Sequence, residues 1–288
     1  MYKRLHADSR TLTALLLATT LMVGATGCAA NEEESSALGV ATTILPVADF
    51  VNNVGGELVE VTLMVPSGAS PHTYEPTPGQ MVEVSEADVY VKVGSGVEFE
   101  VVWLDNLLEQ NQDMEIVDCS EGVSLMGSDP HIWNSPVIAM QMAENIVDGL
   151  SQADPENADT YRKNGDAYVA RLMSLHEDIE SMFEDASTRV FMIYHPAFGY
   201  FAAEYGLTQL PIEHEGKDPT PQLLQKAIDD ATEYNLQYVF VAPQFATDNA
   251  TSVAEAIGGE LASANALPEG DYIANMLDVA EAIALELE

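Results

Sequence analysis

Short apolar runs rich in β-branched residues alternate in this chain with segments whose apolar residues recur every three or four positions. The runs form two series, and they are GVATTIL, VEVTLMV, ADVYVKVG and MEIVD, then VFMIYH, LPIEHEG and YVFVAP. Segments such as Pro78–Glu86 and Val101–Gln110 have helical spacing. Alternation of this kind builds βα units around a buried, mainly parallel sheet. The sequence therefore predicts an α/β fold with two lobes, each with its own central sheet.

One long helix is predicted between the two series. Asp154, Pro155 and Glu156 supply an N-cap, a proline at the first helical position and an acid in the first turn. An apolar stripe with helical spacing follows them at Tyr161, Gly165, Tyr168, Leu172, Leu175, Ile179 and Met182. A helix of about 29 residues is roughly 43 Å long and would tie the lobes together rigidly. The expected division is an N-terminal lobe at 38–153, the linking helix at 154–186 and a C-terminal lobe at 187–288.

The start of the chain is typical of a secreted protein. Lys3 and Arg4 precede an apolar run that ends in small residues before Cys28, as in a secretory signal peptide. The letters ATGC resemble a bacterial lipobox, in which the cysteine carries lipid and becomes the first residue of the mature chain. We predict a lipoprotein signal peptide at 1–27 and an acidic tether at 28–37. Ordinary secretion with cleavage near Cys28 is the alternative.

The charge of the chain excludes some classes of partner and favours another. Ten basic residues against 47 acidic residues give a net charge of −37. Nucleic acids and anionic membrane surfaces need a basic surface, which this composition does not supply. A strongly negative field raises the local concentration of cations instead. We therefore expect a cation as the small partner and no binding of nucleic acid.

Three histidines stand in loops beside proline. His72 lies in SGASPHTYEP, His131 in GSDPHIWNSP and His195 in MIYHPAFGYF, each at or near the carboxyl end of a predicted strand. Ligands of open α/β sheets bind at that edge. Neutral imidazoles suit zinc and other first-row metals. From spacing alone, each histidine can equally be a turn or core residue, so a metal site is one of two interpretations.

Other residues near these loops have two interpretations as well. His214, in IEHEGKDP, is either a loop histidine whose charge is balanced by its acidic neighbours or a spare or transfer ligand for the metal. His176 is expected on the solvated side of the long helix. Asp129 and Glu75 flank the loop histidines and can orient imidazole N–H groups, while Asp129 can instead shape a turn. Four aromatic residues are expected in the core around the site, and they are Trp133, Phe198, Tyr200 and Phe201.

Four motifs in order resemble a known family. SGASPHTYEPTP, ADVYVKVGSGVEFE, DPHIWNSP and YHPAFGYFAAEYGL with IEHEGKDPTP are similar to the zinc/manganese-type solute-binding lipoproteins of ABC transporters, from about residue 38 to the end. The resemblance implies a receptor outside the cytoplasm, lipid-anchored to the cell membrane through Cys28, and we expect it to be a monomer. Such a receptor captures a divalent metal ion between two lobes and delivers it to an ABC permease in the membrane.

The resemblance also implies a ligand set. His72, His131 and His195 match the three metal-binding histidine positions of the family. Where family members often have an aspartate in a segment resembling V-x-D-P-L, this chain has SANALPE, with Asn265 at the matching place and Glu269 a few residues on. We predict Glu269 as the fourth ligand, with water or a three-coordinate protein site as alternatives.

The same residues favour one metal over another. A histidine at position 195 favours Zn²⁺, because manganese-type members tend to have a carboxylate there and Mn²⁺ prefers oxygen ligands. Zinc-type relatives often have a histidine-rich loop before the second motif, whereas CSEGVSLMGS contains no histidine. We predict zinc transport, with a manganese receptor of the same type as the alternative.

Two other functions are less well supported by the sequence. Three histidines with an open position can also form a catalytic zinc site. The chain has no HExxH motif that would place a base beside the metal, so we predict that it is not an enzyme. A surface adhesin is the third possibility, and no repeat or stalk supports cell adhesion as the primary role.

Overall fold

The computed structural model describes residues 37–213 and 217–287. The predicted signal peptide, Cys28 and His214 lie outside the described residues. The chain from Ser36 onward groups into one compact unit. Among the described residues, no helix combines the length and the apolar character needed to cross a membrane.

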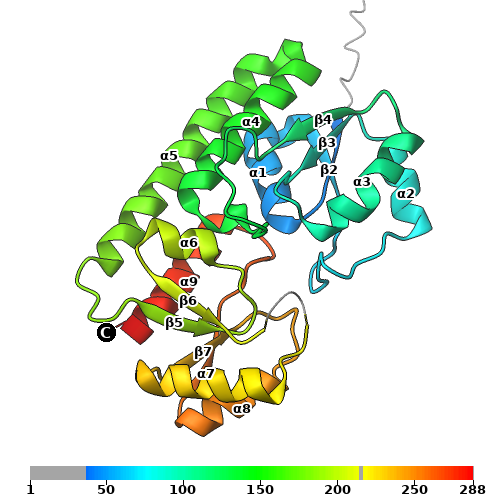
Figure 1. Cartoon of the computed structure of the whole chain (residues 1–288). Coiled ribbons are helices and arrows are strands. Elements are labelled where there is room, and N and C mark those ends of the chain that lie inside the picture. The colour runs from blue at the N-terminus through cyan, green and yellow to red at the C-terminus, as the bar shows by residue number, and fades with distance from the viewer. Residues whose placement is uncertain (1–36, 214–216, 288) are drawn as a thin grey trace, which may run out of the picture. The chain divides into compact units, whose positions relative to one another are not determined.

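The N-terminal lobe contains a four-stranded parallel sheet in the order β2-β1-β3-β4 (Figure 1). Its strands are β1 (Leu38–Thr42), β2 (Val59–Leu63), β3 (Val89–Lys92) and β4 (Glu115–Asp118). Val40 of β1 pairs with Val61 on one side and with Val89 on the other. All four predicted apolar runs of the first series thus contain a strand of this sheet.

The C-terminal lobe repeats this plan with the order β6-β5-β7-β8, again with parallel pairs throughout. Its strands are β5 (Val190–Ile193), β6 (Thr208–Pro211), β7 (Tyr238–Val241) and β8 (Glu260–Ser263). The predicted α/β fold with two mainly parallel sheets is confirmed. Strand β8 was not among the predicted runs, because ELAS is a largely exposed edge strand without an apolar pattern.

Helices connect the strands of both sheets. Those of the N-terminal lobe are α1 (Leu45–Gly55), α2 (Pro78–Ser85), α3 (Glu98–Gln110) and α4 (Pro136–Ala153). Those after the linking helix are α6 (Gly199–Glu204), α7 (Pro221–Glu233), α8 (Asp248–Ile257) and α9 (Tyr272–Leu287). Short 3₁₀ turns cover Gly56–Leu58, Ile132–Asn134 and Pro155–Asn157. Two helices begin at a threonine cap followed by proline, which fixes the loop before each of them: Thr77 before α2 and Thr220 before α7.

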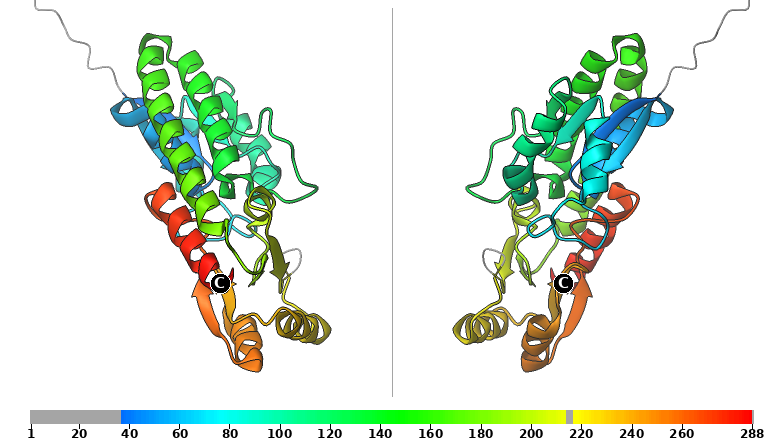
Figure 2. Two further views of the ribbon diagram at one scale, coloured as in Figure 1. Left: turned by 90° about the vertical axis from the view of Figure 1, so that its left-hand side faces the viewer. Right: turned by 90° about the vertical axis from the view of Figure 1, so that its right-hand side faces the viewer.

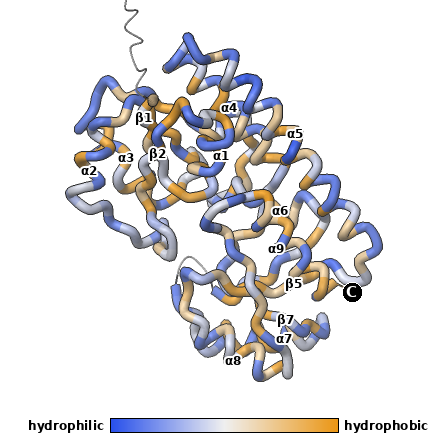
Figure 3. The backbone as a smooth tube through the Cα atoms, turned by 180° about the vertical axis from the view of Figure 1, so that it is seen from behind, coloured by the Kyte–Doolittle hydropathy of each residue, from blue (hydrophilic) through white to orange (hydrophobic). Residues whose placement is uncertain are grey.

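The predicted linking helix is α5 (Ala158–Phe183), with 26 residues and therefore a length of about 39 Å. It is shorter than expected because Pro155–Asn157 forms a separate 3₁₀ turn before it. The predicted stripe from Tyr161 to Ile179 is buried, but its last buried residue is Phe183 and not Met182. The helix contacts α1 and α4 on the N-terminal side and α9 on the C-terminal side (Figure 2). Along α5, Figure 3 shows repeated changes between hydrophobic and hydrophilic residues, as expected for a helix with one buried face.

One continuous apolar core runs through both lobes and the helices between them. The four aromatic residues predicted for the core are all buried: Trp133, Phe198, Tyr200 and Phe201. Trp133 also links the lobes, because its indole Nε1 donates to the carbonyl of Ala266 (2.8 Å) and its own carbonyl accepts from Tyr272 Oη (2.6 Å). The carboxyl ends of the two sheets are therefore held next to each other.

Candidate metal centre

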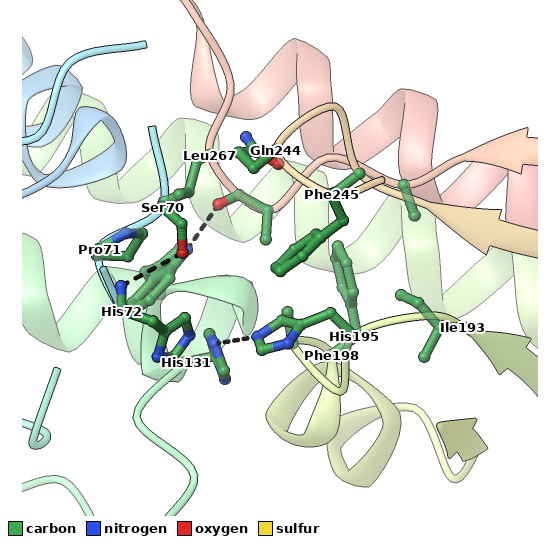
Figure 4. Close-up of a pocket in the computed structure, with 15 residues that line it drawn as sticks. Ser70, Pro71, His72, His131, Ile193, His195, Phe198, Gln244, Phe245 and Leu267 are labelled. Carbon is green, nitrogen blue, oxygen red and sulfur yellow. Dashed lines mark hydrogen bonds between the residues drawn. The ribbon is translucent and has the colours of Figure 1, made fainter. Parts of the chain in front are cut away.

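Three histidines from different loops converge between the carboxyl ends of the sheets. His72 follows β2, His131 follows β4 and His195 follows β5. One ring nitrogen of each lies within 4.8 Å of the others. Figure 4 shows the three imidazoles around one small space, with His72 and His131 from the N-terminal lobe and His195 from the C-terminal lobe. Among the described residues, no other group of His, Cys, Asp or Glu side chains meets this criterion for a metal ion.

The loop that bears His72 is held by one glutamine of the next helix. Gln80 Nε2 donates to the carbonyl of Met64 at 2.6 Å, at the start of the loop. Gln80 Oε1 accepts from Tyr74 Oη (2.8 Å) and from the backbone N of Thr77 (3.0 Å), at its end. The side chain that completes the N-terminal cap of α2 therefore also fixes both ends of this loop.

The loop that bears His131 is fixed by contacts from both lobes. Asp129 Oδ1 accepts from the backbone N of His131 at 3.0 Å and from its ring Nδ1 at 2.7 Å. Ser95 Oγ donates to the carbonyl of Pro130 at 2.5 Å. From the C-terminal lobe, Tyr200 Oη donates to the carbonyl of Asp129 at 3.2 Å. His131 is therefore a buried ring with little freedom to turn.

His195 is held by the neighbouring strand and by an aromatic ring. Its Nδ1 lies 3.0 Å from Glu213 Oε2, and its ring stacks on Phe245 with centroids 4.6 Å apart. The strand register explains the pairing with Glu213. Ile193 of β5 pairs with Pro211 of β6, and His195 and Glu213 each come two residues later. The geometry of a parallel sheet therefore places this carboxylate beside this imidazole.

The spacing of two of the ring nitrogens suits a zinc ion. The Nε2 atoms of His131 and His195 are 3.2 Å apart. Two nitrogens bound to one tetrahedral zinc at about 2.0–2.1 Å lie roughly 3.4 Å from each other. The third ring, His72, has its Nδ1 at 3.6 Å from Glu98 Oε2. Each of the three histidines thus has a carboxylate on its Nδ1 side, which is the usual way to direct Nε2 at a metal.

The surroundings of His72 and His131 favour the neutral imidazole. Burial lowers the pKa of His72 below 6.5, and the proximity of His195 and His131 lowers it further. Burial also lowers the pKa of His131, against the opposite effect of its hydrogen bond with Asp129. Neutral imidazole is the form that binds metal. The cavity is otherwise walled mainly by apolar side chains, among them Trp133, Phe198, Phe245, Ala264, Ala266 and Leu267.

The residues considered for a fourth ligand lie apart from the three histidines. Glu269 is exposed and accepts a hydrogen bond from Ser67 Oγ, so it links the loops of the two lobes outside the group. Asn265 Oδ1 accepts from Gln244 Nε2 and from the backbone N of Leu267, both at 3.0 Å. Neither side chain lines the cavity in this structure. Glu269 as a metal ligand stays a prediction, to which its observed position adds no support.

The residues that contact the histidines were only partly foreseen. Asp129 was expected to orient an imidazole, and it contacts His131. For His72 the expected residue was Glu75, whereas the carboxylate near its ring is Glu98 of α3. Glu213 was noted only as a neighbour of His214, although the alignment of two parallel strand ends could have identified it. His176 is half-buried, with Nδ1 at 3.2 Å from Tyr205 Oη, and so it is less solvated than expected.

Known proteins with a similar sequence or structure take up or bind zinc or manganese. Residues 40–285 match the family of the periplasmic component A of zinc-uptake complexes, ZnuA. The high-affinity zinc uptake system protein ZnuA of Bacillus subtilis is 30% identical over 278 residues, covering 88% of this chain and 87% of the relative. The manganese-binding lipoprotein MntA of Halalkalibacterium halodurans is 32% identical over 256 residues, with 83% of each chain covered. A crystal structure of a ZnuA deletion mutant with zinc bound has a TM-score of 0.82 and 37% identity, covering 87% of this chain and 98% of that one.

Proposed function

Because this chain belongs to the family of the periplasmic component A of zinc-uptake complexes, we propose that His72, His131 and His195 capture one zinc ion for import through an ABC permease. The observation that supports this most is the convergence of three imidazole nitrogens within 4.8 Å, from loops of both lobes. Three nitrogen donors leave one tetrahedral position open, and we assign it to water.

Zinc is preferred to manganese in this proposal. The three donor groups are imidazoles, and no carboxylate among the described residues joins their group. Imidazole suits zinc, whereas manganese prefers carboxylate, carbonyl and water oxygens. The manganese-binding relative is about as similar to this chain as the zinc-uptake relative, so overall identity does not separate the two metals. The choice therefore depends on the ligand set.

Capture is proposed to need only a small movement of the lobes. We propose the lobe boundaries at 38–153 and 187–288, with 154–186 as the linking segment. Helix α5 contacts helices on both sides of this division, and Trp133 bonds to Ala266 across it. These connections resist a wide hinge opening. His72 is the most exposed of the three ligands, at 21% of its side chain, and we propose that the ion enters and leaves past its loop.

The cellular setting is proposed from the sequence and the relatives together. Periplasmic and lipoprotein components are found among the matched proteins. We propose that this chain is exported, anchored through lipid on Cys28 and active as a monomer beside its permease. The net charge of −37 supports a cation as its cargo and no role with nucleic acid.

We propose binding and not catalysis as the role of the site. The described residues that line the cavity include no carboxylate that could serve as a general base beside the metal. The test is calorimetric titration of the metal-free protein with zinc, followed by assay of the zinc form with a simple ester. One bound zinc and no ester hydrolysis above that of free zinc is the expected result. Absence of zinc binding would refute the proposal.

A further inference from the structure

Three neutral imidazoles bring no charge to a divalent ion. An ion held by His72, His131 and His195 would place two positive charges in a cavity with mainly apolar walls. A buried charge is costly unless an opposite charge lies nearby. The protein must therefore supply negative charge from outside the ligand group.

Two carboxylates lie directly behind two of the ligands. Asp129 Oδ1 is 2.7 Å from Nδ1 of His131, and Glu213 Oε2 is 3.0 Å from Nδ1 of His195. A carboxylate accepts hydrogen bonds and does not donate them, so Nδ1 carries the hydrogen in both rings. In that tautomer the lone pair lies on Nε2, and these two Nε2 atoms face each other at 3.2 Å.

We propose that Asp129 and Glu213 are positioning residues for the ion: each fixes the tautomer and orientation of one histidine, and together they offset its charge. This inference rests on the proposed function. Glu213 is only 3% exposed, so its charge acts through a medium that screens it weakly. Glu98 is different, because its side chain is 59% exposed and lies 3.6 Å from His72. It contributes less, since water and salt screen an exposed charge.

A glycine of the C-terminal lobe makes room for one of these carboxylates. A Cβ atom at Gly199, the first residue of α6, would lie 2.3 Å from Asp129 Oδ2. The side chain of Asp129 therefore occupies space that only a glycine leaves open. Gly199→Ala keeps every charge of the site but forces Asp129 to move. This variant therefore tests how much the orientation of His131 matters while the charge of Asp129 is kept.

The first test measures zinc affinity in four variants by competition with a chelator. Asp129→Asn and Glu213→Gln should each weaken zinc binding by about 10–100-fold, the usual cost of losing such a partner. Glu75→Gln removes the same charge from an exposed side chain with no hydrogen bond to a histidine, and should bind within about twofold of wild type. Gly199→Ala should lose about tenfold. Thermal unfolding of each metal-free variant identifies any that fails to fold.

The results separate this inference from the proposed function. If wild type binds no zinc, the proposed function itself is refuted. If wild type binds zinc and both Asp129→Asn and Glu213→Gln bind like Glu75→Gln, only the positioning role is refuted. Wild-type affinity in Gly199→Ala would refute the contribution of orientation at Asp129.

A second measurement reads the tautomers directly and does not depend on the folding of any variant. Long-range ¹H–¹⁵N correlation spectra of the zinc-loaded wild-type protein report which ring nitrogen of each histidine carries hydrogen. The expected result is hydrogen on Nδ1 of His131 and His195. Hydrogen on Nε2 of either ring would overturn the inference for that ring, because its carboxylate would then not be an acceptor.

Discussion

The Nε2 atoms of His131 and His195 lie 3.2 Å apart, although the two residues are 64 positions apart in the chain and come from different lobes. The contact exists because each residue stands in a loop at the carboxyl edge of its own parallel sheet. Two lobes built on the same plan therefore create, where those edges meet, a site that neither lobe contains alone.

Loss of any one of the three loop histidines should weaken zinc binding. His72→Ala, His131→Ala and His195→Ala should each weaken zinc binding by at least tenfold, because each removes one of the three proposed ligands. His176→Ala is the matched control, since His176 lies on α5 with its Nδ1 3.2 Å from Tyr205 Oη, outside the group. Competition with a zinc chelator measures all four. Wild-type affinity in the three loop variants would refute the ligand assignment.

Zinc binding should weaken as the pH falls below about 6.5. Burial lowers the pKa of His72 and of His131, so both are neutral at pH 7 and remain so somewhat below the usual value of 6.5. At lower pH, protons compete with zinc for the ring nitrogens. We expect nearly constant affinity from pH 8 to 7 and a large loss by pH 5.

The same two histidines should make the metal-free protein less stable as the pH falls. A lowered histidine pKa means that the unfolded chain takes up protons at a higher pH than the folded one does. Below about pH 6.5 the contribution of His72 and His131 to the free energy of unfolding should therefore fall as the pH is lowered. Denaturant titrations between pH 7.5 and 5.5 measure this. The raised pKa values of Asp49, Glu100 and Glu286 act in the opposite direction, so the comparison is with His72→Ala. A fall in stability no steeper in wild type than in His72→Ala would contradict the assigned direction for His72.

Glu269→Gln should leave zinc affinity within about threefold of wild type, since an exposed carboxylate outside the group contributes little. In the structure Glu269 accepts a hydrogen bond from Ser67, so its expected role is to join two loops. A loss as large as that of His72→Ala would instead make Glu269 the fourth ligand, as predicted from the sequence. Ser67→Ala separates the two roles, because it removes only the link between loops.

Gly165→Ala should destabilise the protein although alanine favours helices. Gly165 is buried on α5, and a Cβ atom there would lie 2.2 Å from Val147 Cγ2 of α4. Overpacking of this kind costs about 1–3 kcal/mol, more than the gain of roughly 1 kcal/mol in helix propensity. Thermal unfolding should show a lower Tm. Asp166→Ala, on the exposed side of the same helix, is the control and should not lower it.

Much of this molecule could be predicted from local patterns. The alternation of strands and helices, the long helix and its buried stripe depend on periodicity within one segment. The histidine loops stood out because proline and strand ends mark them. Strand β8 was missed because an exposed edge strand such as Glu260–Ser263 needs few apolar residues. Its place is set by pairing with β7, which local sequence does not encode.

The contacts around the histidines were harder to predict because they depend on packing between distant segments. Glu213 reaches His195 only through the register of β5 with β6. Glu98 comes near His72 because of where α3 begins relative to the loop after β2. Asp129 was predictable because it lies two residues from its partner His131. Asp129 was therefore predicted from its place beside His131, whereas Glu213 and Glu98 were not, because their positions depend on strand register and helix placement.

Three imidazole nitrogens are proposed to select zinc. Calorimetric titration of the metal-free protein with zinc and with manganese, in the same buffer at pH 7.5, tests it most directly. We expect one zinc per chain, and manganese bound at least about tenfold more weakly, because manganese prefers oxygen ligands. Manganese binding equal to or stronger than zinc binding would contradict it and would mean that an oxygen ligand completes the site.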